Sequence, residues 1–189
     1  MYISDERRMV YLAAPKTASK ATASVLRERG FKLAKHLPNS HPVKVLGTKT
    51  HSHHQTLTEH PGEGWTVFTT VRNHWDTFVS WFTYQNKTGV QFDEAYIDRI
   101  ASGYPMYYPD DDKLWSQYTR FADAVLRYES LQEDFNRMLG RATAIPRVNI
   151  SPGRGGRHYS VYYDDALRLY VAERFREEIE DYGYHFEAA

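Results

Sequence analysis

The segment Trp65–Phe82 changes its hydrophobic period halfway along, and this change limits the fold more than any other feature of the sequence. Its first part, Trp65–Val71, is a continuous apolar and β-branched run, which is typical of a strand buried on both faces. From His74 onward, apolar residues recur at the spacing i, i+3, i+4, i+7 of one helix face. Met9–Ala14 and Thr17–Arg29 repeat the same succession nearer the start of the chain. A buried strand that leads directly into a helix, found twice, predicts an α/β fold with parallel strands.

The rest of the chain continues this alternation. Further strands are expected at Val43–Leu46 and Ala122–Tyr128, and further helices at Phe92–Ala101, Asp111–Phe121, Ser130–Leu139 and Asp164–Tyr182. Ser130 is expected to cap its helix, because Glu133 follows three residues later as in a capping box. Gly30 is placed to end the helix that precedes it. The pattern predicts one three-layer α/β domain over residues 1–189, with a central, mostly parallel sheet flanked by helices.

Composition restricts the classes of protein to which the chain can belong. Hydrophobic residues make up 41% of its 189 residues and charged residues 25%, as in globular proteins. Lys plus Arg and Asp plus Glu both number 24, so no overall field attracts nucleic acid, and we expect no nucleic-acid partner. No cysteine is present, no signal peptide is recognisable, and no apolar run approaches the roughly 20 residues of a membrane span. These features predict a soluble, cytoplasmic protein and leave its oligomeric state open.

The turn after the first predicted strand, Pro15–Thr22, combines the parts of an anion site. Lys16 and Lys20 supply positive charge, and the start of the following helix presents unpaired backbone N–H groups. The remaining members supply hydroxyl donors, or small side chains that let an anion approach the backbone: Thr17, Ser19, Thr22, Ala18 and Ala21. The alternative is an ordinary turn with solvated lysines. The turn contains no glycine and is not a Walker A loop, which argues against an ATPase or GTPase.

A second candidate for anion binding follows the strand Trp65–Val71. Arg72 comes at the carboxyl end of that strand, where open α/β sheets bind ligands, and a guanidinium can hold a phosphate through two hydrogen bonds. Ser80 lies eight residues later, off the apolar stripe of its helix. In the alternative interpretation, Arg72 is a structural ion-pair partner and Ser80 belongs to a solvated helix face.

These segments together resemble the donor-binding motifs of the sulfotransferases that use 3′-phosphoadenosine 5′-phosphosulfate (PAPS). Pro15-Lys16-Thr17 resembles the 5′-phosphosulfate loop of that family. Val71-Arg72-Asn73-x-Trp75-Asp76, followed by Val79-Ser80-Trp81-Phe82, resembles its 3′-phosphate motif, including the Arg-to-Ser spacing. Five later segments are similar to the short, carbohydrate-type members: Tyr128–Leu131, Val148–Ser151, His158–Tyr159, Tyr162–Asp165 and Ile179–Phe186. The resemblance spans nearly the whole chain, and it implies a P-loop-like form of the α/β fold.

The resemblance also implies a role for each candidate residue. Lys16 would contact the transferring sulfuryl group and the bridging oxygen. The rest of the loop would bind the 5′-phosphate, largely through backbone N–H groups: Thr17, Ala18, Ser19, Lys20, Ala21 and Thr22. Arg72 and Ser80 would hold the 3′-phosphate, with Arg154 and Arg157 of a late basic loop as secondary candidates. The donor would leave as 3′,5′-adenosine bisphosphate, and the mechanism of the family requires no metal.

Three residues depart from the pattern of the family. His74 stands where the family usually has proline, Ala18 where glycine is common, and Lys20 where serine or threonine is common. A proline at a helix start mainly preorganises the helix, so the change at His74 is expected to matter little. The other two lie in the 5′-phosphosulfate loop, and the additional charge of Lys20 is compatible with an anionic ligand.

Histidine is the expected general base for the acceptor hydroxyl at neutral pH. The polar stretch Thr48–His60 holds the candidates His51, His53 and His54. Its Lys-Thr-His opening resembles the base-bearing segment of the cytosolic members, which selects His51, and its later portion resembles that of the carbohydrate-type members, which selects His54. We place His54 first, His51 second and His53 third. A zinc cluster and a polar loop without a role are the alternatives, and the spacing lacks a clear further set of zinc ligands.

The sequence therefore predicts a sulfotransferase that moves a sulfuryl group from PAPS to a hydroxyl of a carbohydrate or another small acceptor. In-line positioning and electrostatic stabilisation are expected to supply most of the acceleration. Two alternatives remain. One is a non-catalytic nucleotide-binding module of the same fold, and the other is an ATP-dependent kinase or phosphotransferase. Acceptor-binding residues lie on variable loops, so the sequence does not identify the acceptor.

Overall fold

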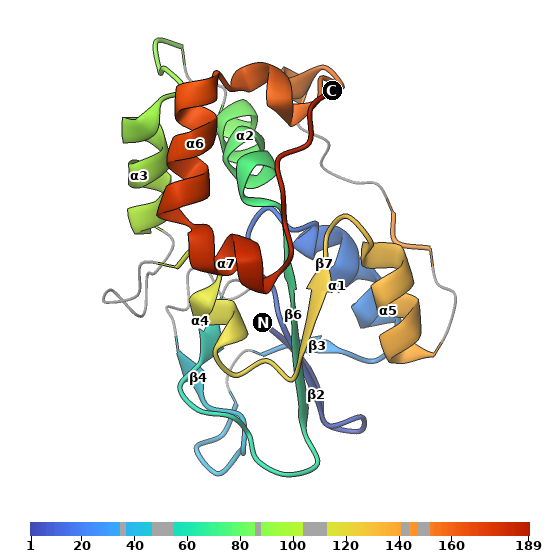
Figure 1. The fold of residues 1–189 in the computed structure, drawn as a ribbon. Coiled ribbons are helices and arrows are strands. Elements are labelled where there is room, and N and C mark those ends of the chain that lie inside the picture. Colours follow the sequence, from blue (N-terminus) through green and yellow to red (C-terminus); the bar gives the residue numbers. More distant parts are fainter. Residues whose placement is uncertain (35–36, 47–54, 86–87, 104–112, 141–143, 147–151) are drawn as a thin grey trace. The chain divides into compact units, whose positions relative to one another are not determined.

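The computed structural model of the chain describes residues 1–34, 37–46, 55–85, 88–103, 113–140, 144–146 and 152–189 (Figure 1). The chain divides into two compact units. Unit 1 comprises Met1–Val71 and Gln117–Val148, and unit 2 comprises Arg72–Ser116 and Asn149–Ala189. Each unit is described by itself below. The single domain expected over residues 1–189 stays a prediction.

Unit 1 contains a mixed five-stranded sheet in the order β3-β1-β2-β6-β7. Its strands are β1 (Tyr2–Ser4), β2 (Met9–Leu12), β3 (Lys32–Leu33), β6 (Thr66–Val71) and β7 (Ala124–Arg127). β2 and β7 both run parallel to β6, whereas β1 pairs antiparallel with β2 and β3. The α/β class with a mostly parallel sheet centre is therefore confirmed. Because β2, β6 and β7 are parallel, their carboxyl ends lie at one edge of the sheet.

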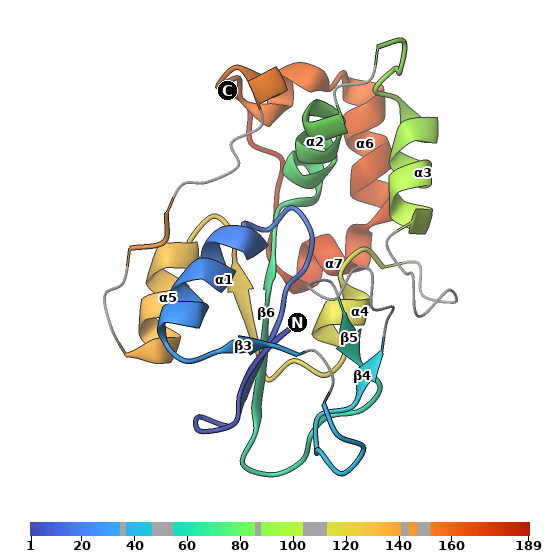
Figure 2. The same ribbon diagram turned by 180° about the vertical axis from the view of Figure 1, so that it is seen from behind.

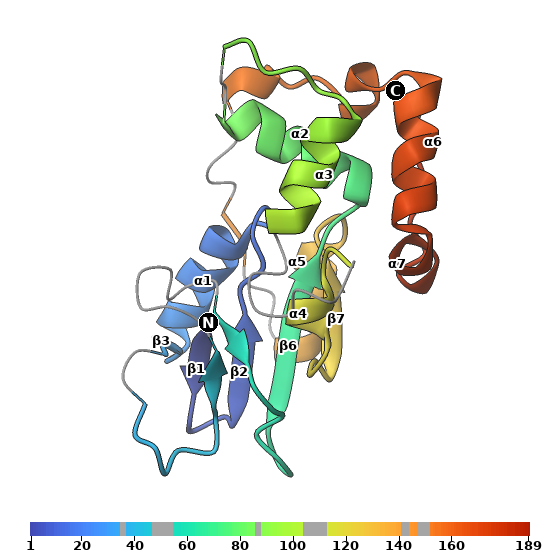
Figure 3. The same cartoon turned by 90° about the vertical axis from the view of Figure 1, so that its left-hand side faces the viewer.

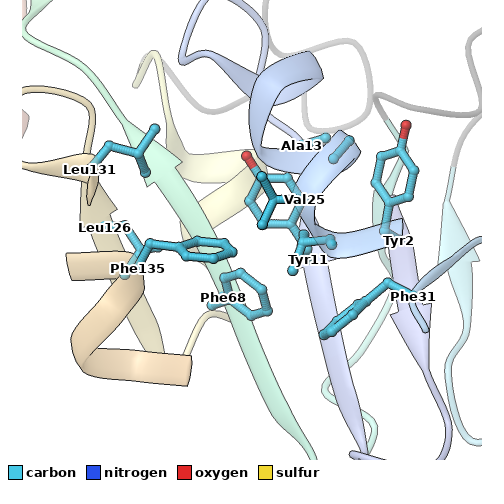
Figure 4. Packing of buried hydrophobic residues seen from close by; sticks show 11 residues of the cluster. Tyr2, Tyr11, Ala13, Val25, Phe31, Phe68, Leu126, Leu131 and Phe135 are labelled. Carbon is cyan, nitrogen blue, oxygen red and sulfur yellow. The ribbon is translucent and has the colours of Figure 1, made fainter. Parts of the chain in front are cut away.

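Two helices cover one face of this sheet, α1 (Ser19–Glu28) and α5 (Leu131–Leu139) (Figure 2). Figure 4 shows their apolar side chains, including Val25 and Phe135, packed against the strand residues Tyr11 and Phe68. The rings of Tyr11 and Phe68 lie 5.0 Å apart between centroids. This core fixes α1 on the sheet, and with α1 the loop that joins it to β2. The three-layer, P-loop-like arrangement stays a prediction.

The end of α1 agrees with the sequence-based expectation, whereas the start of α5 does not. Gly30 ends α1 as expected, in the left-handed conformation with φ of 86°. The N–H of Phe31 donates to Leu26 O and that of Gly30 to Arg27 O, which is a Schellman motif. The expected cap of α5 is wrong, because the Ser130 hydroxyl donates to Asp134 Oδ2 and caps no backbone N–H.

Three short strands were not predicted, and one expected strand is shorter than predicted and belongs to a separate sheet. β1, β3 and β5 (Thr56–Leu57) have only two or three residues, too few for a period to be read. The strand expected at Val43–Leu46 is β4 (Val45–Leu46), which pairs antiparallel with β5 in a separate two-stranded sheet.

Unit 2 is helical in the residues that the structure describes. Its elements are α2 (His74–Gln85), α3 (Glu94–Gly103), α6 (Asp165–Arg174), α7 (Arg176–Asp181) and two short 3-10 helices, η2 (Pro152–Arg154) and η3 (Tyr159–Tyr162). α2 packs against α3, α6, η2 and η3, so it is the central helix of the unit. Figure 3 shows α6 leading into α7.

Two helix predictions in this part of the chain are wrong in detail. The helix expected over Asp164–Tyr182 breaks at Phe175, whose φ of −118° separates α6 from α7. Of the helix expected over Asp111–Phe121, the described part contains only α4 (Ser116–Thr119). The second difference involves Glu178 of α7, because its buried carboxylate accepts hydrogen bonds of 2.7 Å from the N–H groups of Leu114 and Trp115. These two amides are bonded to a side chain, and α4 begins only after them.

Candidate functional site

The loop between β2 and α1, residues 13–18, follows a carboxyl end of the parallel strands of unit 1. Lys16 and Ala18 both adopt left-handed backbone conformations, with φ of 65° and 59°. A non-glycine residue pays roughly 1–2 kcal/mol for that conformation. Strain of this kind concentrates at ligand-binding loops, where it turns backbone N–H groups toward a shared point. The backbone of the loop is therefore compatible with the predicted anion site, although the loop contains no glycine.

The start of α1 is not capped by its own sequence. Ala18 occupies the N-cap position, makes no side-chain cap hydrogen bond, and is followed by no acidic residue in the first turn. By contrast, α6 is capped by Asp164, whose carboxylate accepts from the N–H of Leu167. An N-terminus with this composition leaves its partial positive charge to a ligand or to solvent.

The side chains of the loop differ from one another in exposure. Lys20 is exposed and Lys16 is partly buried, whereas Ser19 and Ala21 are buried. Thr17 and Thr22 are fully buried, and the Thr17 hydroxyl donates 2.8 Å to Ala14 O. The expected contribution of Thr17 to anion binding is therefore restricted to its backbone N–H group. The N–H of Thr22 donates 3.0 Å to Ala18 O, so the expected contribution of Thr22 is not supported.

A group of buried hydroxyls lies on the sheet beneath the loop. The Tyr11 hydroxyl is 3.3 Å from Thr70 Oγ1, and both residues are fully buried. Burial raises the pKa of Tyr11, and the hydroxyls of Thr70, Thr22 and Thr17 lower it in part. The Thr22 hydroxyl completes no hydrogen bond among the described residues. Tyr11 remains a neutral hydrogen-bonding group that supports the start of α1 from below.

Arg72, Asp76 and Arg154 form the arginine cluster of unit 2. Arg72 donates to Asp76 Oδ2 from Nε at 2.9 Å and from Nη2 at 2.6 Å. Arg154 donates to the other oxygen, Oδ1, from Nη1 at 2.6 Å. The three side chains are 7%, 12% and 20% exposed in the order Arg72, Asp76, Arg154. One buried and one partly buried cation share one carboxylate, so the formal charges of these three side chains sum to +1.

The first turn of α2 holds Asp76 in place. Asn73 precedes the helix as its N-cap residue, and its side-chain oxygen accepts from the N–H of Asp76 at 3.3 Å. The side-chain amide of Asn73 donates 3.0 Å to His185 O. Asp76 lies in that first turn, where the helix dipole stabilises a carboxylate.

Ser80 and Arg157 complete the set of residues proposed from the sequence for the 3′-phosphate. Ser80 lies one turn beyond Asp76 on α2 and is buried, so the interpretation as a solvated-face residue is wrong. Arg157 is exposed and lies with its guanidinium 5.7 Å from the ring centroid of Tyr162. Its carbonyl oxygen accepts from Arg154 Nε at 2.6 Å. The interpretation of Arg72 as an ion-pair partner is confirmed, and a guanidinium with five donors can serve a ligand as well.

The histidines expected to act as the base, His51, His53 and His54, lie outside the described residues. The structure adds His74, which is fully buried with Nε2 3.0 Å from Glu178 Oε2. Sequence analysis assigned His74 no role beyond replacing a proline. It belongs to the framework of unit 2 because its ring packs against Phe175 at 5.4 Å between centroids.

The predicted residues fall into two groups, one in each unit. Lys16, Thr17, Ala18, Ser19, Lys20, Ala21 and Thr22 form one continuous segment of unit 1, and Arg72, Ser80, Arg154 and Arg157 belong to unit 2. Sequence analysis missed the role of Asp76, although its position four residues after Arg72 at a helix start is a pattern typical of an ion pair.

Comparison with known proteins identified no relative: no protein-family model, curated protein or solved structure matches the chain. Within the described residues, no group of three or more metal-ligating side chains is present. Among the helices that the structure describes, none is both long and apolar enough to cross a membrane.

Proposed function

We propose that the chain is a PAPS-dependent sulfotransferase acting on a hydroxyl of a carbohydrate or another small acceptor. The arginine cluster carries the proposal, because Arg72 and Arg154 meet at one carboxylate and retain an excess positive charge. The resemblance to the sulfotransferases assigns Arg72 to the 3′-phosphate of the donor and makes Arg154 a secondary candidate for donor binding, and we place both arginines at the 3′-phosphate. The strained loop at Lys16 and the uncapped start of α1 support a second anion site, for the 5′-phosphosulfate.

The proposed reaction is an in-line substitution at sulfur. The acceptor hydroxyl oxygen forms a bond to sulfur, while the bond from sulfur to the 5′-phosphate oxygen breaks. The bonding electrons leave with 3′,5′-adenosine bisphosphate, and the hydroxyl proton passes to a histidine, His54 or His51. Lys16 stabilises the charge that develops on the bridging oxygen, a contact worth about 10²–10³-fold in rate when it resembles an oxyanion hole. Positioning and fixed charges supply the rest, and no metal is required.

The first test is donor binding to the purified protein. Adenosine 3′,5′-bisphosphate at a hundred times its Kd raises the unfolding free energy by about 2.7 kcal/mol, which is a melting shift of several degrees. We expect this shift without magnesium, and a smaller one with adenosine 5′-phosphate. A shift with magnesium and ATP alone would instead favour a phosphotransferase.

The second test is sulfuryl transfer from PAPS to a panel of carbohydrate and small hydroxyl acceptors. Lys16→Ala and Arg72→Ala are each expected to abolish transfer in a folded protein. Lys32→Ala and Arg7→Ala remove exposed cations outside the candidate site and serve as matched controls. Replacement of the true base, by His54→Ala or His51→Ala, is expected to lower turnover about 10²–10⁴-fold without weakening donor binding. Normal activity of Lys16→Ala or Arg72→Ala would contradict the proposal.

A further inference from the structure

Asp76 joins two arginines that are distant in the sequence. Arg72 lies directly before α2, and Arg154 is in η2, 78 residues beyond Asp76. Each carboxylate oxygen serves one guanidinium: Oδ2 accepts twice from Arg72, and Oδ1 accepts from Arg154. Contacts of 2.6–2.9 Å between ionised groups are the strong class of hydrogen bond, so both side chains are held in one orientation.

The carboxylate itself is fixed by a further set of contacts. Its residue lies in the first turn of α2, and its backbone N–H is bonded to Asn73. Asn73 is in turn bonded to the backbone at His185, and Arg154 is held a second time through the carbonyl of Arg157. The position of each guanidinium is therefore determined before any ligand arrives, and this kind of preorganisation raises affinity by reducing the ordering cost of binding.

We propose that Asp76 is a positioning residue, which sets Arg72 and Arg154 as a rigid pair for the 3′-phosphate of the donor. The inference rests on the proposed function and deepens it, because it makes a negatively charged side chain necessary for binding an anion. Charge alone leads to the opposite expectation. Removal of the Asp76 charge raises the formal charge of the cluster from +1 to +2, which attracts a phosphate more strongly. The sign of the change in affinity therefore separates positioning from charge.

The test is calorimetric titration of wild type and Asp76→Asn with adenosine 3′,5′-bisphosphate and with adenosine 5′-phosphate. We expect the variant to bind the bisphosphate about tenfold more weakly or worse, and the monophosphate with about its original affinity. Asp165→Asn is the matched control, since Asp165 also lies in the first turn of a helix of unit 2 and pairs with an arginine, Arg168, but is 93% exposed. It should alter neither affinity. Equal or tighter bisphosphate binding by Asp76→Asn would overturn the inference, as would an equal loss for both ligands.

A second variant keeps the inference testable if Asp76→Asn does not fold. Asp76→Glu retains the charge and displaces the carboxylate by one methylene group. Positioning predicts weaker bisphosphate binding, whereas charge alone predicts no change, and unchanged binding would overturn the inference.

A ligand-free measurement separates this inference from the proposed function. The Nε–H group of Arg72 donates to Asp76 in the structure, so its ¹⁵N-resolved signal should exchange slowly with water in wild type and rapidly in Asp76→Asn. Slow exchange in both proteins would refute the positioning role. If wild type binds neither nucleotide, the proposed function fails, and the exchange rate still decides whether Asp76 fixes Arg72.

Discussion

The loop before α1 and the arginine cluster before α2 follow neighbouring parallel strands in the sequence, and the two proposed anion sites are built in different ways. The loop relies on its backbone, with Lys16 and Ala18 held in left-handed conformations and a helix start that lacks a cap. The arginine cluster relies on side chains, with one buried and one partly buried cation arranged around Asp76. One region therefore stores conformational strain, and the other combines two cations with one carboxylate. Substitutions that act on backbone freedom and those that act on charge should therefore affect different regions.

The largest expected effect follows from removing Glu178, whose carboxylate joins distant segments of unit 2. Glu178 accepts from two backbone N–H groups and contacts His74, the first residue of α2. Glu178→Ala leaves these buried groups without their partner, and we expect a loss of about 3–5 kcal/mol in unfolding free energy. Urea denaturation measures it. Glu177→Ala is the matched control, because Glu177 is the neighbouring residue and its ion pair with Lys113 is exposed, so no measurable change is expected. Similar stability of the two variants would contradict the structural role of Glu178.

The next effect concerns the charge of the arginine cluster. Arg154→Ala removes one of the two cations that share Asp76 and lowers the formal charge of the cluster from +1 to zero. Loss of a charged hydrogen-bonding group costs about 1.5–3 kcal/mol, so bisphosphate affinity should fall about 10–100-fold. Titration at two salt concentrations measures the affinity and its screening. Arg176→Ala is the control, since Arg176 is exposed and pairs with the exposed Glu173. A normal affinity for Arg154→Ala would show that the cluster is purely structural.

The sequence predicted the elements that hold the two regions better than the contacts within them. β2 with α1 and β6 with α2 were predictable because long apolar runs and helix stripes carry a clear period. Arg72 with Asp76 could have been paired from their i, i+4 spacing. The contact from Arg154 to the same carboxylate could not, because it joins residues 78 positions apart and depends on how η2 packs against α2.

The break at Phe175 shows why the rest was not predictable. No glycine or proline marks the position, and the apolar spacing continues across it. The buried Phe175 ring packs between His74 and Phe78, with centroid distances of 5.4 Å to each. Tertiary packing thus decides where α6 ends, and local helix propensity does not indicate the position of that end. The left-handed conformation of Ala18, in contrast, could have been predicted from the sequence, because glycine is common at this position in the resembled family.

A smaller effect tests the strain in the loop. Ala18→Gly relieves a left-handed conformation that costs roughly 1–2 kcal/mol. The additional freedom of glycine stabilises the unfolded chain by about 0.4–1 kcal/mol, which offsets part of this gain. We expect a net gain of up to about 1 kcal/mol in unfolding free energy. Ala23→Gly provides the contrast, because Ala23 is inside α1, where glycine costs about 1 kcal/mol. Urea denaturation compares the two, and a loss of stability for Ala18→Gly as large as for Ala23→Gly would show that the loop is not strained.

The smallest expected effect concerns Asp123, a charged residue outside both regions. Its contribution to stability tests whether its charge matters, as the charge of Asp76 does in the arginine cluster. Asp123 lies before β7, accepts from the N–H of Val67 at 2.7 Å, and contacts His60. Burial raises the pKa of Asp123, but the Val67 N–H and His60 outweigh burial, so the pKa is lowered from its usual value near 3.8. The resulting stability is present above that value and is lost as the pH falls through the lower, folded-state pKa. Wild type should therefore exceed Asp123→Asn in unfolding free energy near pH 6, and the difference should shrink below about pH 4. The partly exposed pair is screened by water, so the difference should stay well below that for Glu178→Ala. If the difference in unfolding free energy between wild type and Asp123→Asn stayed constant across the pH range, Asp123 would act through the conformation of its turn and not through its charge. It would then resemble the loop before α1 and not the arginine cluster.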